Sequence, residues 1–365
     1  MKILRLTTAL DFGGVEKMYE LFASHYQGNH EYVFVALGRD GRTGQKLRDM
    51  GYEAFGFGFE NPSVYNPKVT LKLRKWLKKQ KFDLIHTASA EANFHGTIAA
   101  KLAGVPVIMV EEIGIPSHSK QAQIIFKTIY KWVDEFVWES RAIQSRLIEF
   151  KEVKPNVGRI IHNPVAVPEI EDVPERNDPN EWLIASIGRL AAVKNFEMLI
   201  RLVVYLNEQD KPSRLLLVGD GPHKEVLTAL IAELEATDFV EMPGYADKPT
   251  NRITHADLYI QPSFSEGFGI SVVEAMMVGL PAIGSNVGGM QDIIEHGKNA
   301  WFMDPNGSVE ALANQVVEVM EMPAEERRAI AELGKQSAFE RFTPEMYIQK
   351  LEDFYEEAYS QKTRK

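Results

Sequence analysis

The chain has 365 residues, no cysteine and a formal net charge of −10 at pH 7. Without thiols it can form no disulfide, no zinc–thiolate site and no cysteine nucleophile, and its 45% hydrophobic and 25% charged residues exclude a disordered or fibrous protein. The chain is too long to fold around one hydrophobic core of ordinary size, so we expect two domains of roughly 160 to 180 residues each.

The charge is divided unevenly along the chain. Residues 1–165 carry 23 Lys and Arg against 17 Asp and Glu, whereas the remainder carries 18 against 34. No apolar segment of signal-peptide length begins the chain, and nowhere do about 18 apolar residues follow one another. We therefore expect a cytoplasmic protein, and the acidic overall balance argues against a nucleic-acid partner.

The first half alternates between strand-like and helix-like segments, which is typical of a doubly wound parallel sheet. The strand candidates are residues 2–7, 32–37, 84–87, 107–110, 135–138 and 158–162. Helical periodicity separates them at residues 15–26, 94–103, 124–132 and 142–150.

Two glycines, Gly13 and Gly14, stand where the first strand should turn into a helix. Glycine lets the backbone approach a ligand closely, and the first amides of a helix favour an anion. The turn is therefore either a phosphate-facing loop or only a tight turn. The spaced glycines and later acidic residue of a dinucleotide-binding fingerprint are absent, so no nicotinamide cofactor is expected.

A basic amphipathic helix is predicted at residues 68–81. Its apolar residues, which recur at helical spacing among cations, are Val69, Leu73, Trp76 and Leu77. Two interpretations stay open. The stripe packs on the sheet and leaves a solvated cationic back, or the helix contacts an anionic membrane surface.

Residues 164–180 hold four prolines among acidic side chains, so neither helix nor strand can continue there and an interdomain linker is expected. The alternation then restarts, with strand candidates at residues 182–187, 214–218, 239–242, 258–261, 281–284 and 300–303. Residues 323–342 and 344–360 are long helical patterns without a strand between them. A second doubly wound domain is predicted.

Two cations follow the strand at residues 182–187. The strand runs into Gly188-Arg189-Leu190, and Lys194 stands at the start of the next amphipathic helix. In an open α/β sheet, ligands bind outside the carboxyl ends of the strands. Arg189 and Lys194 are thus placed where a diphosphate needs neutralising, with surface salt bridging as the alternative for each.

The most informative segment is residues 262–276, Pro-Ser-Phe-Ser-Glu-Gly-Phe-Gly-Ile-Ser-Val-Val-Glu-Ala-Met. Glu266 and Glu274 enclose a loop with two glycines that enters an apolar helix near Ile270. The start of that helix offers free amides and a positive dipole end to an anion. We expect Glu274 in the first helical turn, where its carboxylate can accept hydrogen bonds from a ligand, and Glu266 just ahead of the helix, facing the same pocket. The alternative is that one carboxylate only complements the helix dipole and the other is a solvated surface charge.

Together these segments resemble the family 4 nucleotide-sugar glycosyltransferases, which are retaining enzymes with the two-domain GT-B fold. The likeness spans nearly the whole chain and rests on four motifs in order: Gly13-Gly14-Val15-Glu16, Gly188-Arg189-Leu190 with Lys194, Val218-Gly219-Asp220-Gly221-Pro222, and Glu266-Gly267-Phe268-Gly269 through Glu274-Ala275. It implies an α/β protein with two Rossmann-like domains facing across a cleft. The acceptor-binding domain would be residues 1–165, the donor-binding domain residues 166–343, and residues 344–365 a C-terminal helix returning to the first domain.

The resemblance implies transfer of a sugar from a nucleoside diphosphate, with UDP-sugars favoured, to an acceptor hydroxyl with retention. Arg189, Lys194 and Glu266 would be catalytic: the cations stabilise the leaving diphosphate, and Glu266 binds hydroxyls of the transferred sugar. Glu274 would bind the ribose. The other donor-binding residues implied are Gly13, Gly14, Gly188, Phe268, Gly269 and Ile270.

No Asp-x-Asp pair occurs in the chain, so we expect no metal and no cofactor besides the nucleotide-sugar co-substrate. Many family members carry a histidine after the strand that corresponds to residues 107–110, near the reacting sugar. Here Glu111 and Glu112 follow instead, and either could take that place. His86 is a further candidate near the acceptor.

The acceptor is expected in the first domain, along residues 38–58 or 114–119. Residues 68–81 could contact the inner face of the cell membrane. Such a contact would suit a saccharide or lipid-linked acceptor of surface polysaccharide, lipopolysaccharide or glycolipid assembly. Two other classes stay open: a GT-B epimerase or phosphorylase, and a non-catalytic sugar-binding protein. Acceptor-dependent release of a nucleoside diphosphate belongs only to the transferase.

Overall fold

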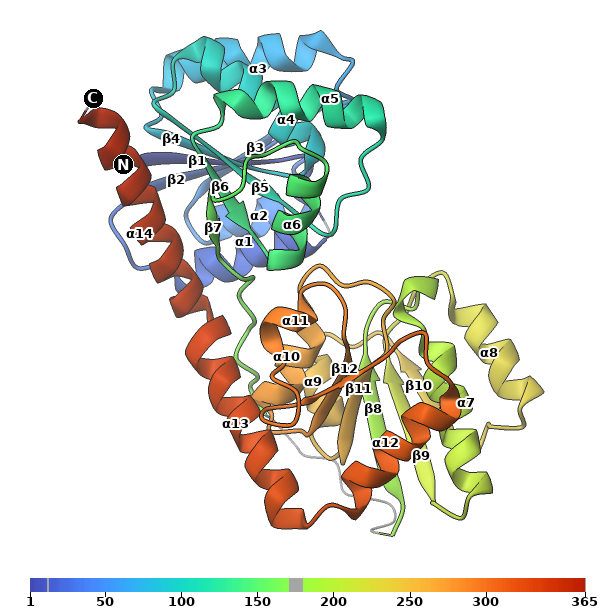
Figure 1. The fold of residues 1–365 in the computed structure, drawn as a ribbon. Coiled ribbons are helices and arrows are strands. Elements are labelled where there is room, and N and C mark those ends of the chain that lie inside the picture. Colours follow the sequence, from blue (N-terminus) through green and yellow to red (C-terminus); the bar gives the residue numbers. More distant parts are fainter. Residues whose placement is uncertain (12, 171–179, 365) are drawn as a thin grey trace. The chain divides into compact units, whose positions relative to one another are not determined.

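The computed structural model describes residues 1–11, 13–170 and 180–364, and the chain divides into two compact units. Unit 1 consists of Met1–Pro164 and Pro344–Lys365, and unit 2 of Val165–Thr343. Each unit is built on its own sheet (Figure 1). Of the predicted linker, residues 171–179 lie outside the described part of the chain, and residues 164–170 form neither helix nor strand.

The sheet of unit 1 has seven parallel strands in the order β3-β2-β1-β4-β5-β6-β7. They are β1 (Lys2–Thr7), β2 (Glu31–Ala36), β3 (Glu53–Gly56), β4 (Leu84–Ala88), β5 (Val107–Glu112), β6 (Glu135–Trp138) and β7 (Arg159–Ile160). The order reverses between β1 and β4, which makes this position the topological switch point of a doubly wound sheet. All the strands predicted in this half are confirmed, whereas β3 was not predicted.

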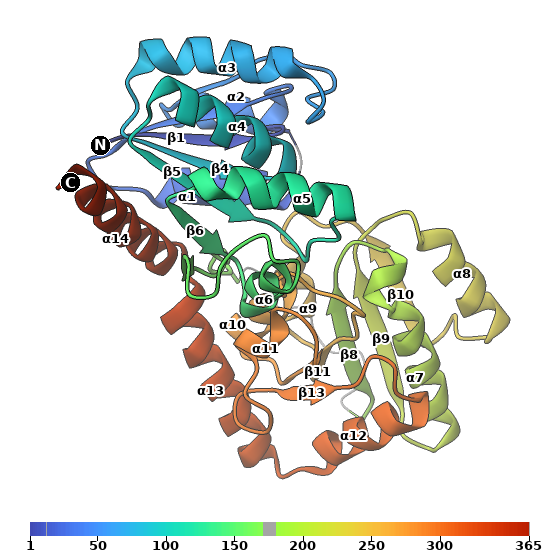
Figure 2. The same ribbon diagram turned by 45° about the horizontal axis from the view of Figure 1, so that its top comes forward.

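Helices cover both faces of this sheet (Figure 2). One face packs against α1 (Gly14–His25), α2 (Gly41–Asp49) and α14 (Pro344–Thr363), and the other against α3 (Pro67–Gln80), α4 (Ala90–Ala103), α5 (Lys120–Ile129) and α6 (Arg141–Glu149). Successive residues of β1 divide between the two cores. Ile3 joins the cluster under α1 and α14, whereas Leu4 joins the cluster under α3 and α4, as the period of a strand requires.

The basic helix α3 starts after Asn66, whose side-chain oxygen accepts a hydrogen bond of 3.2 Å from a backbone amide of the first turn. Pro67 occupies the first position, where its missing amide costs no hydrogen bond. Val69, Leu73 and Leu77 are buried on the sheet. The interpretation that the apolar stripe packs on the sheet is therefore confirmed.

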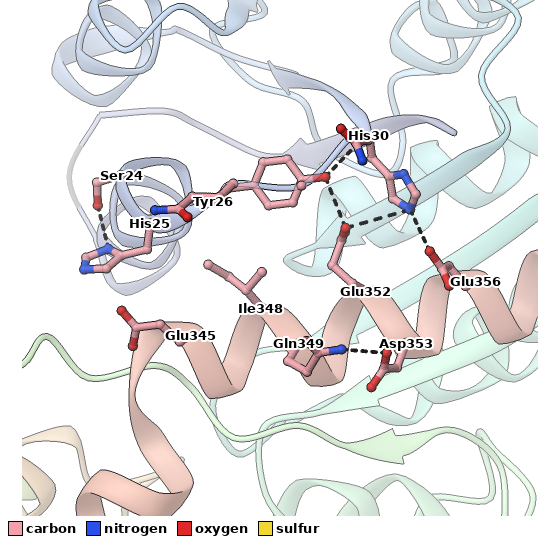
Figure 3. A pocket seen from close by; sticks show the side chains of 13 residues that line it. Ser24, His25, Tyr26, His30, Glu345, Ile348, Gln349, Glu352, Asp353 and Glu356 are labelled. Carbon is pink, nitrogen blue, oxygen red and sulfur yellow. Dashed lines mark hydrogen bonds and ion pairs between the residues drawn. The ribbon is translucent and has the colours of Figure 1, made fainter.

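The C-terminal helix α14 belongs to unit 1, as the resemblance implied. Leu351 is buried in the same cluster as α1. Between the end of α1 and α14 lies a pocket of about 550 Å³ (Figure 3). At this pocket Glu352 accepts hydrogen bonds from the hydroxyls of Tyr26 (3.1 Å) and Tyr32, and lies 3.8 Å from His30.

The sheet of unit 2 has six parallel strands in the order β10-β9-β8-β11-β12-β13. They are β8 (Trp182–Ile187), β9 (Ser213–Val218), β10 (Val240–Gly244), β11 (Leu258–Gln261), β12 (Ala282–Ser285) and β13 (Trp301–Met303). All the strands predicted in this half are confirmed. The switch point of this sheet lies between β8 and β11.

Two further helical layers enclose this sheet. One face is covered by α7 (Phe196–Glu208), α8 (Lys224–Glu233) and α12 (Val309–Glu321), and the other by α9 (Pro249–Ile253), α10 (Ile270–Met277), α11 (Met290–Ile293) and α13 (Ala324–Phe342). The strands are therefore apolar on both faces, which explains their continuous hydrophobic runs. Among the described residues, no helix combines the length and apolarity needed to cross a membrane.

Candidate active site

The loops after β8 and β11 open at the same edge of unit 2, on the two sides of its switch point. The β8 loop carries Gly188, Arg189 and Lys194, and the β11 loop carries Glu266 and leads into α10. Because ligands of open α/β sheets bind at this place, the fold brings the predicted cations and the predicted carboxylate to one binding edge.

The two loops are joined by hydrogen bonds that do not involve the predicted catalytic groups. The amide of Phe264 donates to the carbonyl of Val193 at 2.8 Å. The side-chain amide of Asn195 donates to the carbonyl of Pro262 at 3.2 Å and to a carbonyl after β13 at 3.2 Å. Asn195 adopts a left-handed conformation (φ 55°), which asparagine tolerates better than most residues. The backbone around Lys194 is thereby fixed.

Lys194 and Glu266 form an ion pair between the two loops. Their side chains are 19% and 12% exposed, so water and salt screen the pair less than a surface salt bridge. The hydroxyl of Ser263 donates to the same Oε1 atom of Glu266 at 2.8 Å. Lys194 is therefore a positioned cation.

A chain of hydrogen-bonded polar groups continues from Ser263 into the interior of unit 2. The Tyr259 hydroxyl donates to Oε1 of Gln261 at 2.8 Å, Nε2 of Gln261 donates to Ser263 at 2.9 Å, and the Ser271 hydroxyl donates to Oε1 of Gln261 at 3.0 Å. Burial raises the pKa of Tyr259 well above its usual value, so this hydroxyl remains a donor. Sequence reasoning missed this network, although polar residues at the end of a buried strand, Gln261 and Ser263, were an available signal.

The start of α10 is open to an anion. Gly269 has φ +113°, and a Cβ there would lie 3.2 Å from the Met290 side chain, so both conformation and space favour glycine. The amides of Ile270 and Ser271 make no hydrogen bond to any described residue. The ring of Phe268 is buried against Phe342, so only its backbone can face a ligand at this edge.

Glu274 lies deeper in the helix than we expected. Because α10 begins at Ile270, Glu274 is its fifth residue and belongs to the second turn, which corrects the prediction of a first-turn position. It is half-buried, and its charge contributes to the raised pKa of Tyr259, after burial itself. Residues three and four apart share a helix face, so Glu274 follows the open amides of Ile270 and Ser271 on one side of the helix.

Arg189 is exposed, and it forms no ion pair with any residue that the structure describes. Its loop rests on the turn after β9, where a Cβ on Gly219 would lie 1.9 Å from the Gly188 carbonyl oxygen. The amide of Leu190 also donates to the carbonyl of Asp220 at 3.0 Å. The glycine turn that resembled a family motif therefore supports the backbone that carries Arg189.

Gly13 and Gly14 belong to unit 1 and not to the cluster of unit 2. They follow β1, and α1 starts at Gly14. A Cβ on Gly13 would lie 2.3 Å from Oε2 of Glu16, so a side chain there would require only the flexible Glu16 carboxylate to shift.

His86 and Glu111 lie in the interior of unit 1. Oε2 of Glu111 is 3.5 Å from Nη2 of Arg5 and 3.4 Å from Nε2 of His86, and Arg5 donates to the Tyr355 hydroxyl of α14 at 3.1 Å. Burial raises the pKa of Glu111 to about 6, and Arg5 opposes that shift. Glu111 and Glu112 are the last residues of β5 instead of following it, and this arrangement offers neither His86 nor Glu111 to an acceptor.

Glu112 points to the opposite face of the same sheet. It accepts hydrogen bonds from the Tyr130 hydroxyl (3.0 Å) and the Asn93 amide (3.3 Å), and it lies 3.9 Å from His118. Burial raises the pKa of Glu112 to about 7. His118, in the loop between β5 and α5, also hydrogen-bonds Glu152 at 2.9 Å, so it connects Glu112 of β5 with Glu152, which follows α6. Sequence reasoning did not connect these three residues.

Two doubly wound units, one of them with an ion-paired lysine, an exposed arginine and open helix amides at its switch point, are the architecture of the GT-B fold. Two family models together match most of the chain: Glycosyltransferase Family 4 over residues 12–167, and Glycosyl transferases group 1 over residues 169–337. The chain belongs to the family 4 glycosyltransferases and is a glycosyltransferase with the GT-B fold.

Individual relatives agree with this membership. The chain is 26% identical over 279 residues to the UDP-Gal:alpha-D-GlcNAc-diphosphoundecaprenol alpha-1,3-galactosyltransferase of Escherichia coli, covering 70% of this chain and 71% of that protein. It is 27% identical over 277 residues to the sulfoquinovosyl transferase SQD2 of Arabidopsis thaliana, covering 68% of this chain and 53% of that protein. Anabaena Alr3699/HepE, solved in complex with UDP, shares the fold, with a TM-score of 0.83 at 21% identity over 98% of this chain and 100% of that one.

Proposed function

We propose that this glycosyltransferase moves a sugar from a UDP-sugar to an acceptor hydroxyl, with retention of the anomeric configuration and without a metal ion. The observation that carries the proposal is the positioned Lys194–Glu266 pair at the switch point, on the same sheet edge as exposed Arg189 and the open amides of α10.

The charges of this edge suit a departing diphosphate. The bond between sugar and phosphate breaks with charge building up on the phosphate oxygen, and positioned donors stabilise such charge most effectively. Arg189 supplies a forked donor, Lys194 keeps further N–H donors beyond the one used on Glu266, and Ile270 and Ser271 supply amides.

Glu266 suits a role in orienting the transferred sugar. Its Oε1 atom accepts from Lys194 and Ser263, whereas Oε2 accepts no hydrogen bond from any described residue. Because Lys194 and Ser263 both donate to Oε1, the Glu266 carboxylate is a weaker nucleophile than a free one. We therefore assign Glu266 to the sugar hydroxyls. The phosphate oxygen that leaves the sugar would take the acceptor proton on the same face, which gives retention.

Glu274 is assigned to the ribose hydroxyls, one helical turn behind the diphosphate amides. The choice of uridine is supported by the Anabaena protein, which was solved with UDP, and by the Escherichia coli relative, whose name specifies UDP-Gal. No metal is needed in this scheme because Arg189, Lys194 and the helix amides supply the positive charge, and the chain contains no Asp-x-Asp pair.

The acceptor is proposed to be a saccharide, free or lipid-linked, of surface polysaccharide, lipopolysaccharide or glycolipid assembly at the inner face of the cell membrane. The Escherichia coli relative names a diphosphoundecaprenol-linked acceptor. Residues 68–81 support a peripheral contact with anionic lipid. The apolar stripe of α3 is buried, and its cations Lys68, Lys72 and Lys75 are exposed with no acidic residue in the helix.

Calorimetric titration with UDP, GDP and ADP, followed by a transfer assay with UDP-sugars and a lipid-linked saccharide extract, tests the proposal. We expect UDP to bind most tightly, UDP release to require acceptor, and the new linkage to keep the donor's anomeric configuration by NMR. Nucleotide release without acceptor, an epimerised donor, or an inverted product would contradict it.

A further inference from the structure

The loop that carries Glu266 rests on a segment from later in unit 2. The amide of Gly289, just ahead of α11, donates to the carbonyl of Glu266 at 3.1 Å. A Cβ on Gly289 would lie 2.2 Å from the Gly267 carbonyl oxygen and 2.5 Å from the Cα of Phe268, so only glycine lets the two backbones approach so closely. We call residues 266–269 the donor loop, and its backbone is seated directly on the start of α11.

The second support of the donor loop is Phe342, the last residue of α13. Its ring is 1% exposed and lies 5.2 Å from the ring of Phe268, at an interplanar angle of 71°. This is an edge-to-face contact of two aromatic side chains. It lies where α13 runs beside α10 (Figure 1). Because Phe268 stands two positions before Ile270, the contact fixes the chain immediately ahead of the open amides of α10.

Arg341 ties the same end of α13 to α11. Its Nη2 donates to the carbonyl of Asp292 in α11, and its guanidinium lies 4.6 Å from the centre of the Phe342 ring. α11 in turn lies against the end of the donor loop, because a Cβ on Gly269 would be 3.3 Å from Cδ1 of Ile293. The two supports of the donor loop are therefore joined to each other, and a shift at the end of α13 reaches the loop through both.

Phe342 also stands where the chain leaves unit 2. Unit 2 begins at Val165 and ends at Thr343. The amide of Val165 donates to the carbonyl of Phe342 at 2.8 Å, and Val165 is buried in the same cluster as Phe268 and Phe342. One residue thus contacts the donor loop with its ring and the first residue of unit 2 with its carbonyl oxygen.

We propose that Phe342 is a positioning residue of the donor site, which links the diphosphate amides of α10 to the segments where the chain enters and leaves unit 2. Because its side chain is buried, Phe342 acts through Phe268 and not by contact with the nucleotide. A ligand that orders the start of α10 then also orders the contact between Val165 and Phe342, and the reverse holds, since coupling between two sites is reciprocal. The inference rests on the proposed function, because it takes the diphosphate to bind at Ile270 and Ser271.

Calorimetric titration of the full chain with UDP tests the role of the Phe342 ring. Phe342→Leu keeps an apolar side chain but loses the ring contact, so we expect it to weaken UDP binding by about fivefold or more. Leu206→Ala is the matched control. Leu206 is also 1% exposed, but it belongs to the core on the other face of the unit 2 sheet. We expect its variant to lose stability and to keep the UDP affinity of the unmodified chain.

Arg341→Gln is the second variant, and it remains informative if Phe342→Leu folds poorly. It removes the link between α13 and α11 without emptying the core, so UDP binding should weaken in the same direction. Arg327→Gln is its control. Arg327 lies at the other end of α13 and likewise donates to main-chain carbonyls, those of Val319 and Met322, at 3.1 Å each. Its variant should bind UDP as the unmodified chain does.

Hydrogen exchange at Val165 separates positioning from a general change of stability. UDP should slow exchange of the Val165 amide more than that of the Leu312 amide, which donates to the Ser308 carbonyl in the core on the other face of the sheet. This excess protection should be lost in Phe342→Leu. UDP affinities that are equal in each variant and its control, or no excess protection at Val165, overturn the proposal. Absence of UDP binding to the unmodified chain would instead overturn the proposed function.

Discussion

Lys194, in the loop after β8, forms an ion pair with Glu266, in the loop after β11. The two residues lie 72 positions apart in the chain, and the pair spans the switch point of unit 2. A lysine paired in this way keeps its charge at a defined place, which is what stabilisation of a departing diphosphate requires. The donor site that we propose is built around this pair.

Removal of either cation should weaken catalysis without unfolding the protein. We expect Lys194→Ala and Arg189→Ala each to lower turnover by about 10²–10³-fold and to weaken UDP binding, because each loses a charge-assisted contact with the leaving group. Arg201→Ala removes an exposed cation of α7 and is the matched control. Steady-state rates and calorimetry check the prediction, and both variants behaving like Arg201→Ala would remove these residues from the site.

Activity should persist in excess chelator. Fixed cations and helix amides hold the diphosphate in our proposal, and the chain offers no Asp-x-Asp pair to hold a divalent ion against it. Transfer rates measured in EDTA, then with added magnesium or manganese, should agree within about twofold. A complete loss in EDTA that either metal restores would refute metal independence.

The two carboxylates should fail in different ways. Glu274→Ala should weaken binding of UDP itself by about 1–3 kcal/mol, the cost of a lost hydrogen bond at a charged group. Glu266→Ala should leave UDP affinity nearly unchanged but depress turnover and discrimination between donor sugars, because contacts with the transferred sugar strengthen in the transition state. Calorimetry with UDP alone separates the two, and equal losses of affinity would show that the assignment is wrong.

Glu112 should make unit 1 less stable as pH rises. The folded chain keeps the Glu112 proton up to about pH 7, whereas the unfolded chain releases it near the ordinary value of 4.5, so the folded state binds more protons in between. His118 acts in the same direction. Burial lowers its pKa, but Glu152 and Glu112 raise it above the usual value, and the stabilising charge is lost as pH rises through it.

The comparison with Glu112→Gln isolates this effect. Between pH 5 and pH 8, the stability of the unmodified chain should fall by about 1–3 kcal/mol relative to that variant. Hydrogen exchange of the β5 amides measures it in unit 1. Glu149→Gln, at a side chain that is 65% exposed, is the control and should show no such difference. A constant difference across the pH range would contradict the burial argument.

The strands could be predicted from the sequence because both faces of each sheet are buried, which leaves short continuous apolar runs such as β8 and β11. The pair β3 and α2 could not be predicted. β3 has four residues, of which only Ala54 is fully buried, and α2 is a polar segment with two glycines, so neither shows a clear period.

The candidate site divides in the same way. The sequence predicts that Arg189, Lys194 and Glu266 lie at the carboxyl edge of the sheet, because each stands between an apolar strand and the next helix. The supporting contacts of Asn195 and Ser263 join loops that are distant in sequence, and no local pattern encodes them. The burial of Glu111 could not be predicted either. A carboxylate at the end of a strand is expected to be exposed, and its partners, Arg5 and His86, lie on other strands.

The most direct test of the donor site is a crystal structure of the protein with UDP. We predict the diphosphate at the carboxyl edge of β8 and β11, with its oxygens within hydrogen-bond distance of Arg189, Lys194 and the amides of Ile270 or Ser271. A diphosphate bound elsewhere on the chain, or at this edge without contact to either cation, would contradict the account.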